Sequence, residues 1–222
     1  MNEVKVIFTK DGSKTLKIPD LNEQYHSIHG AINEAEYVFI KNGFLECKQD
    51  KITIFEMGFG TALNAFMTYL ESNKTSQSIR YYTIENNPLP LKLVESLGYP
   101  ERLNVRNEEF VFSLLHTSEW NTLTTITPTF ELFKISDNIQ KLALDDKVDL
   151  VYYDAFGPRV QADLWNEKIF SKISNVMKPE SILVTYCAKG ELKRILKRLG
   201  FIVETLPGPP GKREMVRAKK IK

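Results

Sequence analysis

The stretch FEMGFGT at residues 55–61 decides the fold of this 222-residue chain. It joins a short apolar run at residues 52–57 to apolar residues at helical spacing from Ala62 to Leu70, which is the pattern of a strand that leads into a helix. Glycine at positions 58 and 60 allows a tight backbone turn and the close approach of a ligand. The N-terminus of the helix beyond the turn offers unpaired N–H groups to that ligand. Such glycine turns also occur for packing alone, so the function of this one depends on its surroundings.

Strand-like and helix-like segments alternate from residue 51 onward. Apolar runs predict strands at residues 52–57, 81–84, 130–135, 148–153, 182–186, 201–206 and 215–218. Helical spacing predicts helices at residues 62–70, 87–98, 107–115, 138–144, 164–177 and 191–199, with Asn87 as the N-cap of the second. The threonine-rich residues 113–128 are expected to form a loop. Alternation at this spacing is typical of a parallel sheet with helices on both faces.

The last two predicted strands require a different connection. Only residues 207–212 separate them, too few for a helical crossover, so they should pair antiparallel. We therefore predict an α/β fold with a Rossmann-like, mostly parallel sheet closed by a C-terminal antiparallel hairpin. This is the arrangement of class I S-adenosylmethionine-dependent methyltransferases.

The residues before this alternation predict a small extension. Residues 4–8 and 15–18 alternate in polarity around the turn signal at residues 10–13, which indicates a β-hairpin. Apolar residues between positions 28 and 39 then fall at helical spacing, and Asn42-Gly43 supplies a stop. We expect an N-terminal extension at residues 1–50 and a methyltransferase domain at residues 51–222.

Composition and charge narrow the class of protein only a little. A net charge of +2 does not imply a nucleic-acid partner, but basic residues crowd positions 189–198 and 212–222. Such clusters can bind a phosphate backbone or form a solvated helix face, and charge alone favours neither. The two cysteines, Cys47 and Cys187, have no metal-ligand spacing, so neither a disulfide framework nor a metal site is expected. Without an apolar stretch long enough for a signal peptide or a membrane span, we expect a cytoplasmic protein.

Glu85 supports the prediction that the glycine turn binds a cofactor. It ends the predicted strand that follows the turn, 25 positions after Gly60, where a carboxylate accepts hydrogen bonds from a ribose diol. Leu63 replaces the third glycine of dinucleotide-binding loops. Glu56 can help to hold the ammonium of a methionine moiety, although a charge at a helix N-terminus is the alternative. These residues favour an adenosyl cofactor with a methionine tail.

Two further acids end predicted strands, and together with Glu56 and Glu85 they should meet at one rim. These two acids are Asp137 and Asp154. They are expected to meet because ligands of open α/β sheets bind outside the carboxyl ends of the strands. A single aspartate at such a place is more often a helix cap than a ligand. The sequence DAFGP at residues 154–158 places an acid, an aromatic ring and a turn where an acceptor would meet the methyl group.

Several motifs carry a specific resemblance. They are YHSIHGA at residues 25–31 with Glu34, FEMGFGTALN at 55–64, YTIE at 82–85, YDAFGP at 153–158 with DLW at 163–165, and GPPGKREM at 208–215. With them the chain resembles the stand-alone methyltransferases that modify the wobble uridine of tRNA. It is also similar to the methyltransferase half of the bifunctional enzyme that completes 5-methylaminomethyl-2-thiouridine. Ala62 and Ser136 stand where that family usually has glycine.

The resemblance implies an S-adenosylmethionine-dependent N-methyltransferase that converts 5-aminomethyl-2-thiouridine to 5-methylaminomethyl-2-thiouridine at the tRNA wobble position. The expected partner is the anticodon region of tRNA. A separate enzyme is expected to supply the aminomethyl precursor, because no flavin-dependent oxidase half is evident in these residues. The resemblance implies Asp154 as the catalytic residue. Cofactor binding is implied for Tyr25, Glu56, Gly58, Phe59, Gly60, Thr61, Asn64, Glu85, Ser136 and Asp137, and substrate binding for His26, Ser27, Gly30, Phe156, Pro158, Trp165, Lys212 and Arg213.

Alternatives stay open at this stage. The histidines near Tyr25 could be satisfied locally, with Ser27 as a helix N-cap. Phe156 and Trp165 could stack on the target uracil or belong to the core. An aminopropyltransferase, another small-molecule methyltransferase and a catalytically silent tRNA-binding module are the competing functions.

Overall fold

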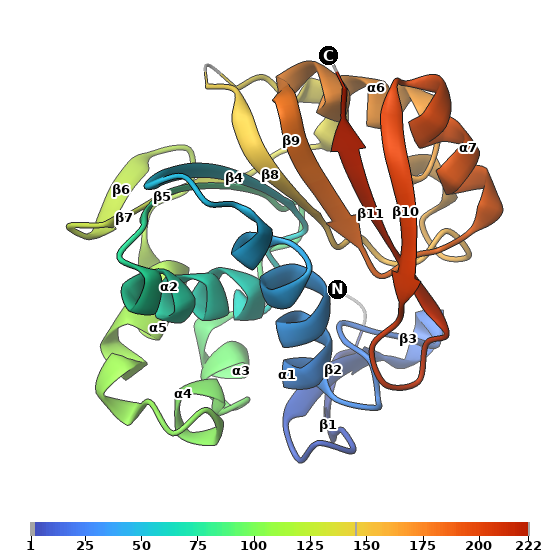
Figure 1. The fold of residues 1–222 in the computed structure, drawn as a ribbon. Coiled ribbons are helices and arrows are strands. Elements are labelled where there is room, and N and C mark those ends of the chain that lie inside the picture. Colours follow the sequence, from blue (N-terminus) through green and yellow to red (C-terminus); the bar gives the residue numbers. More distant parts are fainter. Residues whose placement is uncertain (1–2, 145, 222) are drawn as a thin grey trace.

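The computed structural model describes residues 3–144 and 146–221, and a sheet of eight strands runs through it (Figure 1). The spatial order of the strands is β10-β11-β9-β8-β4-β5-β7-β6. Their bounds are β4 (Lys51–Met57), β5 (Ser78–Ile84), β6 (Leu123–Thr127), β7 (Phe130–Ile135), β8 (Val148–Tyr153), β9 (Met177–Thr185), β10 (Phe201–Pro207) and β11 (Glu214–Lys220).

The pairing of the strands confirms the predicted sheet. β4 pairs parallel with β5 and with β8, and the parallel arrangement continues from β5 to β7 and from β8 to β9. β11 pairs antiparallel with both β9 and β10, because its short connection to β10 must reverse the chain. The C-terminal hairpin is therefore built into the sheet through its second strand.

Helices cover both faces of the sheet (Figure 1). One face carries α1 (Ala31–Ala35), a π-helical turn η2 (Glu36–Lys41), α2 (Leu63–Thr75) and α5 (Glu109–Thr117); the other carries α6 (Glu167–Val176) and α7 (Gly190–Arg198). The shorter helices α3 (Leu91–Glu95) and α4 (Tyr99–Arg102) precede α5. Central strand residues such as Ile54, Phe55 and Val151 are fully buried, as expected where both faces are covered.

Short 3₁₀ turns connect these elements. They are η1 (Pro19–Leu21), η3 (Phe44–Glu46), η4 (Arg106–Glu108), η5 (Ile139–Lys141) and η6 (Ala162–Leu164). No helix among the described residues has both the length and the apolarity that a membrane span requires.

The N-terminal residues form the predicted hairpin and a helix. β1 (Lys5–Phe8) pairs antiparallel with β2 (Lys14–Ile18), and a two-residue strand β3 (Glu23–Gln24) adds to β2. Leu16 of β2 and Val38 of η2 are buried in the same apolar cluster as α2. The division of the chain at residue 50 stays a prediction, and this shared core joins the residues on either side of it.

Three local predictions were wrong. Residues 113–128 are not a loop: α5 continues to Thr117 and the threonine-rich strand β6 pairs antiparallel with β7, since β-branched residues suit an edge strand. Residues 138–144 form only the turn η5, which the Asn138 side chain caps at Gln140. Asn87 caps no helix, because its N–H donates to Glu85 and α3 begins after Pro90.

We expect substitution of Phe130 to destabilise the fold strongly. Phe130 is fully buried on β7 against the rings of Tyr81 and Tyr69, so Phe130→Ala should lower the free energy of unfolding by about 3–5 kcal/mol. Urea denaturation measures this. Phe8→Ala is the matched control, because Phe8 is 74% exposed and its loss should change stability by less than about 0.5 kcal/mol. Equal effects of the two substitutions would contradict the described core.

Candidate cofactor and acceptor site

A cavity of about 1080 Å³ lies at the carboxyl ends of β4, β5, β7 and β8. Eleven of the predicted site residues line it: Tyr25, His26, Gly58, Phe59, Gly60, Thr61, Asn64, Glu85, Asp137, Asp154 and Phe156. The sequence therefore predicted most of the polar wall. It missed the segment after β5, residues 86–90, and the turn at residues 138–140, which also line the cavity.

The glycine turn forms the floor of the cavity. The Gly58 N–H donates to the Ile84 carbonyl (3.1 Å), and a Cβ at position 58 would lie 3.2 Å from the Asp154 carbonyl oxygen. Gly58 has a φ of +91°, a conformation that residues with a side chain rarely adopt. Glycine at this position therefore lets the ends of β4 and β8 approach each other.

Glu85 is held in place by backbone donors on two sides. Its Oε2 accepts from the Gly60 N–H (3.2 Å), and its Oε1 accepts from the Asn87 N–H (2.8 Å). The carboxylate is thereby fixed at the wall of the cavity, where a ribose diol would need it. Asp137 lies on the same wall and pairs with Lys141 (3.1 Å).

Asn64 links the buried carboxyl group of Glu56 to the half-buried carboxyl group of Asp154. Its Nδ2 donates to Asp154 Oδ2 (2.8 Å) and to Glu56 Oε1 (3.1 Å). Burial raises the pKa of both carboxyl groups well above the ordinary value, and the adjacent Asp154 raises that of Glu56 further. Glu56 itself lies behind the cavity wall, so its contact with the cavity runs through Asn64.

Aromatic and imidazole side chains form the other half of the cavity. The rings of Tyr25 and Phe156 meet edge to face with centroids 5.1 Å apart. The ring of His26 lies between two hydroxyl groups, with Nδ1 2.9 Å from Thr15 Oγ1 and Nε2 3.4 Å from Thr61 Oγ1. Burial lowers the pKa of His26 to about 4, so the ring is neutral at physiological pH.

A group of side chains that the sequence did not indicate supports the cofactor loop from behind. His116 Nε2 lies 3.2 Å from the Thr61 carbonyl oxygen, and burial lowers its pKa to about 4, so the neutral ring can donate there. The rings of His116 and Trp120 contact Phe59. Lys134 donates to the His116 carbonyl (2.7 Å), lies over the Trp120 ring, and has a pKa lowered by burial to about 8.

The remaining predicted site residues do not line the cavity. Ser136 is exposed, and Ser27 does not cap α1, whose N-cap is Gly30. Pro158 lies outside the lining as well. Trp165 is not exposed to a substrate as its expected stacking role requires. It is buried among Tyr153, Phe170 and Tyr186, and its indole N–H donates to the Phe156 carbonyl (2.7 Å). Trp165 thus supports Phe156 from the core and does not stack on a substrate.

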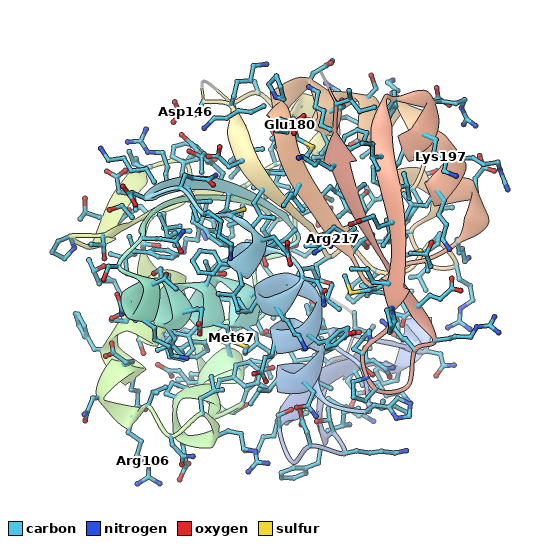
Figure 2. All side chains as sticks on the ribbon, viewed as in Figure 1. Met67, Arg106, Asp146, Glu180, Lys197 and Arg217 are labelled. Carbon is cyan, nitrogen blue, oxygen red and sulfur yellow. The ribbon has the colours of Figure 1, made fainter. Side chains whose placement is uncertain are left out.

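The basic residues of the two predicted clusters differ in whether they form ion pairs. In α7, Lys193, Arg194 and Arg198 form ion pairs with Glu214, Glu191 and Glu167. Half-buried Lys212 pairs with the buried carboxylate of Glu34, which argues against its expected role on a tRNA phosphate. Among the described residues, exposed Lys189, Lys197 and Arg213 form no ion pair; Lys197 lies on the outer side of α7 (Figure 2). Lys222 of the predicted C-terminal cluster lies outside the described residues.

Comparison with known proteins agrees with this site. Residues 115–221 match a family described as S-adenosyl-L-methionine-dependent methyltransferase. The bifunctional protein MnmC of tRNA 5-methylaminomethyl-2-thiouridine biosynthesis is 26% identical in Burkholderia mallei (strain NCTC 10229) and 27% in Burkholderia thailandensis, over 95% of this chain. The chain spans about a third (34%) of the length of these relatives. The crystal structure of MnmC2 from Aquifex aeolicus superposes with a TM-score of 0.78 at 24% identity, covering 100% of this chain and 71% of that one.

The chain thus combines the fold of class I S-adenosylmethionine-dependent methyltransferases with a match to such a family over residues 115–221. Over 95% of its length it is similar to a part of MnmC.

The residues of the cavity fit this cofactor. Glu85 is placed for the ribose, and Asn64, which lines the cavity, has a buried acceptor atom, Oδ1, that receives no hydrogen bond from any described residue. An ammonium donor suits such an acceptor. Gly58 and Gly60 keep the loop free of side chains where the ligand lies closest.

We expect Glu85→Gln to weaken binding of S-adenosylmethionine roughly 10- to 100-fold, the loss of charge-assisted hydrogen bonds to the ribose. Both oxygens of Glu85 already accept from backbone N–H groups, so an amide would also turn its NH₂ against one of those donors. Calorimetric titration with S-adenosylmethionine measures the effect. Glu95→Gln on α3 is the control, because Glu95 is exposed and outside the cavity lining; a Glu85→Gln protein that binds as tightly as this control contradicts the assignment.

Proposed function

We propose that this protein transfers a methyl group to the primary amine of 5-aminomethyl-2-thiouridine at the wobble position of tRNA. The observation that carries the proposal is the place of Asp154, at the boundary between the glycine loop and the aromatic half of one cavity. The MnmC relatives belong to tRNA 5-methylaminomethyl-2-thiouridine biosynthesis, which supports the same substrate.

Asp154 has the geometry to orient an amine. Asn64 donates to Oδ2, and among the described residues no hydrogen bond reaches Oδ1, which stays available to an N–H of the acceptor. When bound, S-adenosylmethionine supplies a methyl group that is already activated on a sulfonium. The protein's contribution is therefore mainly the positioning of the acceptor nitrogen for in-line attack.

The charge of the acceptor is the chemical difficulty, because an alkylamine has a pKa near ~10 in water and only its neutral form attacks. A carboxylate of ordinary pKa would hold the amine protonated. Burial raises the pKa of Asp154, which brings the proton affinities of the two groups closer and makes it a better proton acceptor. An amine that enters as the ammonium must lose one proton before attack, and Asp154 is the group placed to accept it.

Phe156 and Tyr25 are placed to hold the base. Their edge-to-face contact presents an aromatic surface beside Asp154, and a uracil taken out of the anticodon stack could lie against Phe156. The phosphate backbone would meet the exposed cations Arg213, Lys189 and Lys197, which form no ion pair within residues 3–144 and 146–221. In this proposal another enzyme supplies the aminomethyl precursor.

Methylation of tRNA that lacks the final methyl group tests the substrate. The wild-type protein should incorporate methyl groups into this tRNA and not into fully modified tRNA. Asp154→Asn should lower kcat by about 10²–10⁴-fold, the usual contribution of a general base, with little change in cofactor affinity. Absence of methyl incorporation by the wild type would refute the substrate. Transfer of an aminopropyl group from decarboxylated cofactor would identify the competing enzyme class.

The salt dependence of tRNA binding tests the proposed phosphate contacts. Arg213→Gln should reduce the slope of log K against log salt by about 0.7–0.9, the value for one lost phosphate contact. Arg194→Gln should leave the slope unchanged, because Arg194 is engaged by Glu191 (2.7 Å). Filter binding at several salt concentrations measures both, and equal slopes for Arg213→Gln and wild type would remove Arg213 from the interface.

A further inference from the structure

Lys212 makes an ion pair that joins two distant segments of the chain. Its Nζ lies 2.6 Å from Glu34 Oε1, and the Glu34 side chain is only 7% exposed. The lysine comes from the loop between β10 and β11, and the glutamate from α1. Figure 1 shows this loop extending from the sheet toward the N-terminal residues.

The other oxygen of Glu34 holds the segment that carries Tyr25 and His26. Glu34 Oε2 accepts from the Ser27 N–H (2.7 Å), next to His26 in the cavity wall. Both carboxylate oxygens are therefore used, one by the backbone of the Tyr25–Ser27 segment and one by Lys212. This segment and the turn that carries Asp154 and Phe156 are called the acceptor half of the site.

Lys212 also reaches the strand ends that carry the acceptor site. Its Nζ lies 3.6 Å from the centroid of the Tyr186 ring. The Tyr186 hydroxyl donates to the Ala155 carbonyl (2.8 Å), in the residue after Asp154. One ammonium group thus contacts the Glu34 side and the Tyr186 side of the acceptor half.

The loop fits closely where it meets the extension. Gly211 has a φ of +87°, and a Cβ there would lie 2.0 Å from the His29 ring. A side chain at position 211 would require the His29 ring to move, so glycine lets the loop that carries Lys212 pack directly against the N-terminal extension.

Charged and titratable groups surround Asp154 from every neighbouring element. Glu34 raises its pKa and Lys212 lowers it, after the larger effect of burial, while Glu56, Tyr81 and Tyr186 are the other titratable groups electrostatically coupled to it. Lys212 therefore offsets the charge of Glu34 close to the group that meets the acceptor.

We propose that Lys212 is a positioning residue of the acceptor site, which fixes the Tyr25–Ser27 wall against the Asp154 turn and compensates the charge of Glu34. The expected effect on kcat rests on the proposed function, whereas the structural role of Lys212 rests on its ion pair with Glu34. It assigns Lys212 to the support of the acceptor site in place of the tRNA surface.

The kinetic test compares Lys212→Gln with Lys193→Gln. Lys193 belongs to α7 and pairs with Glu214 (2.9 Å) on the same hairpin, away from the cavity lining, so it controls for loss of an ion pair. Lys212→Gln should lower kcat for tRNA methylation by roughly 10- to 100-fold and should keep its affinity for S-adenosylmethionine within about 2-fold, which also shows that the protein is folded. Lys193→Gln should leave both kcat and the affinity for S-adenosylmethionine unchanged.

The sign of the pH effect follows from the charges. Removing the ammonium leaves Glu34 uncompensated, which raises the pKa of Asp154, so the acid limb of kcat against pH should move to higher pH. In Lys212→Gln with Glu34→Gln, both charges are gone and the limb should return toward the wild-type position. A purely structural role would move kcat without moving the limb.

A second readout needs no tRNA. The carboxyl ¹³C resonance of Asp154, assigned by its loss in Asp154→Asn, should titrate at higher pH in Lys212→Gln and close to the wild-type midpoint in Lys193→Gln and in the double variant. This result would support the inference even if no tRNA is methylated. An unchanged midpoint in Lys212→Gln, or a flatter salt dependence of tRNA binding with unchanged kcat, would overturn it.

Discussion

The close approach of three backbone segments at Gly58 is the constraint on which the site depends. The Gly58 N–H donates to Ile84 at the end of β5, and the Asp154 N–H donates to Met57 at the end of β4 (3.2 Å). A Cβ at position 58 would push against the Asp154 carbonyl oxygen. Because this contact is made by backbone atoms, it places the side chains of Glu85, Asn64 and Asp154 within one cavity without depending on their own flexibility.

The cavity favours the neutral forms of its ionisable groups. Burial lowers the pKa of His26 and raises those of Glu56 and Asp154, so each of these groups carries charge less readily than it would in water. In the proposed reaction, an acceptor amine that enters the same surroundings would meet the same penalty, so burial would favour the neutral form that attack requires and Asp154 would orient it.

Position along the strands made much of the fold and of the polar wall predictable. Gly58, Glu85, Asp137 and Asp154 lie at strand ends, and the parallel topology alone brings strand ends together. The strand β6 was missed because its threonines signal a loop and an edge strand equally well, and pairing with β7 decided between them.

The direction of side chains and the pairing of distant residues could not be predicted from the sequence in the same way. Phe156 and Trp165 are both aromatic residues close to Asp154. Phe156 lines the cavity, whereas Trp165 lies in the core and donates a hydrogen bond to the Phe156 carbonyl. Lys212 sits among basic residues, and nothing local distinguishes the one that meets Glu34 from those that stay exposed. The aromatic support of Phe59 by His116 and Trp120 likewise depends on how α5 and the residues beside β7 pack, which periodicity does not specify.

The ion pair between Glu34 and Lys212 spans 178 positions of the chain, and this separation bears on how the molecule assembles. The glycine loop and Glu85 come from adjacent strands of a contiguous β4–α2–β5 unit, whose closure costs little chain entropy. The acceptor half needs residues from the beginning, the middle and the end of the chain. Since contacts between distant residues form late, we expect folding to complete the cofactor-binding unit first and the methyl-acceptor half last.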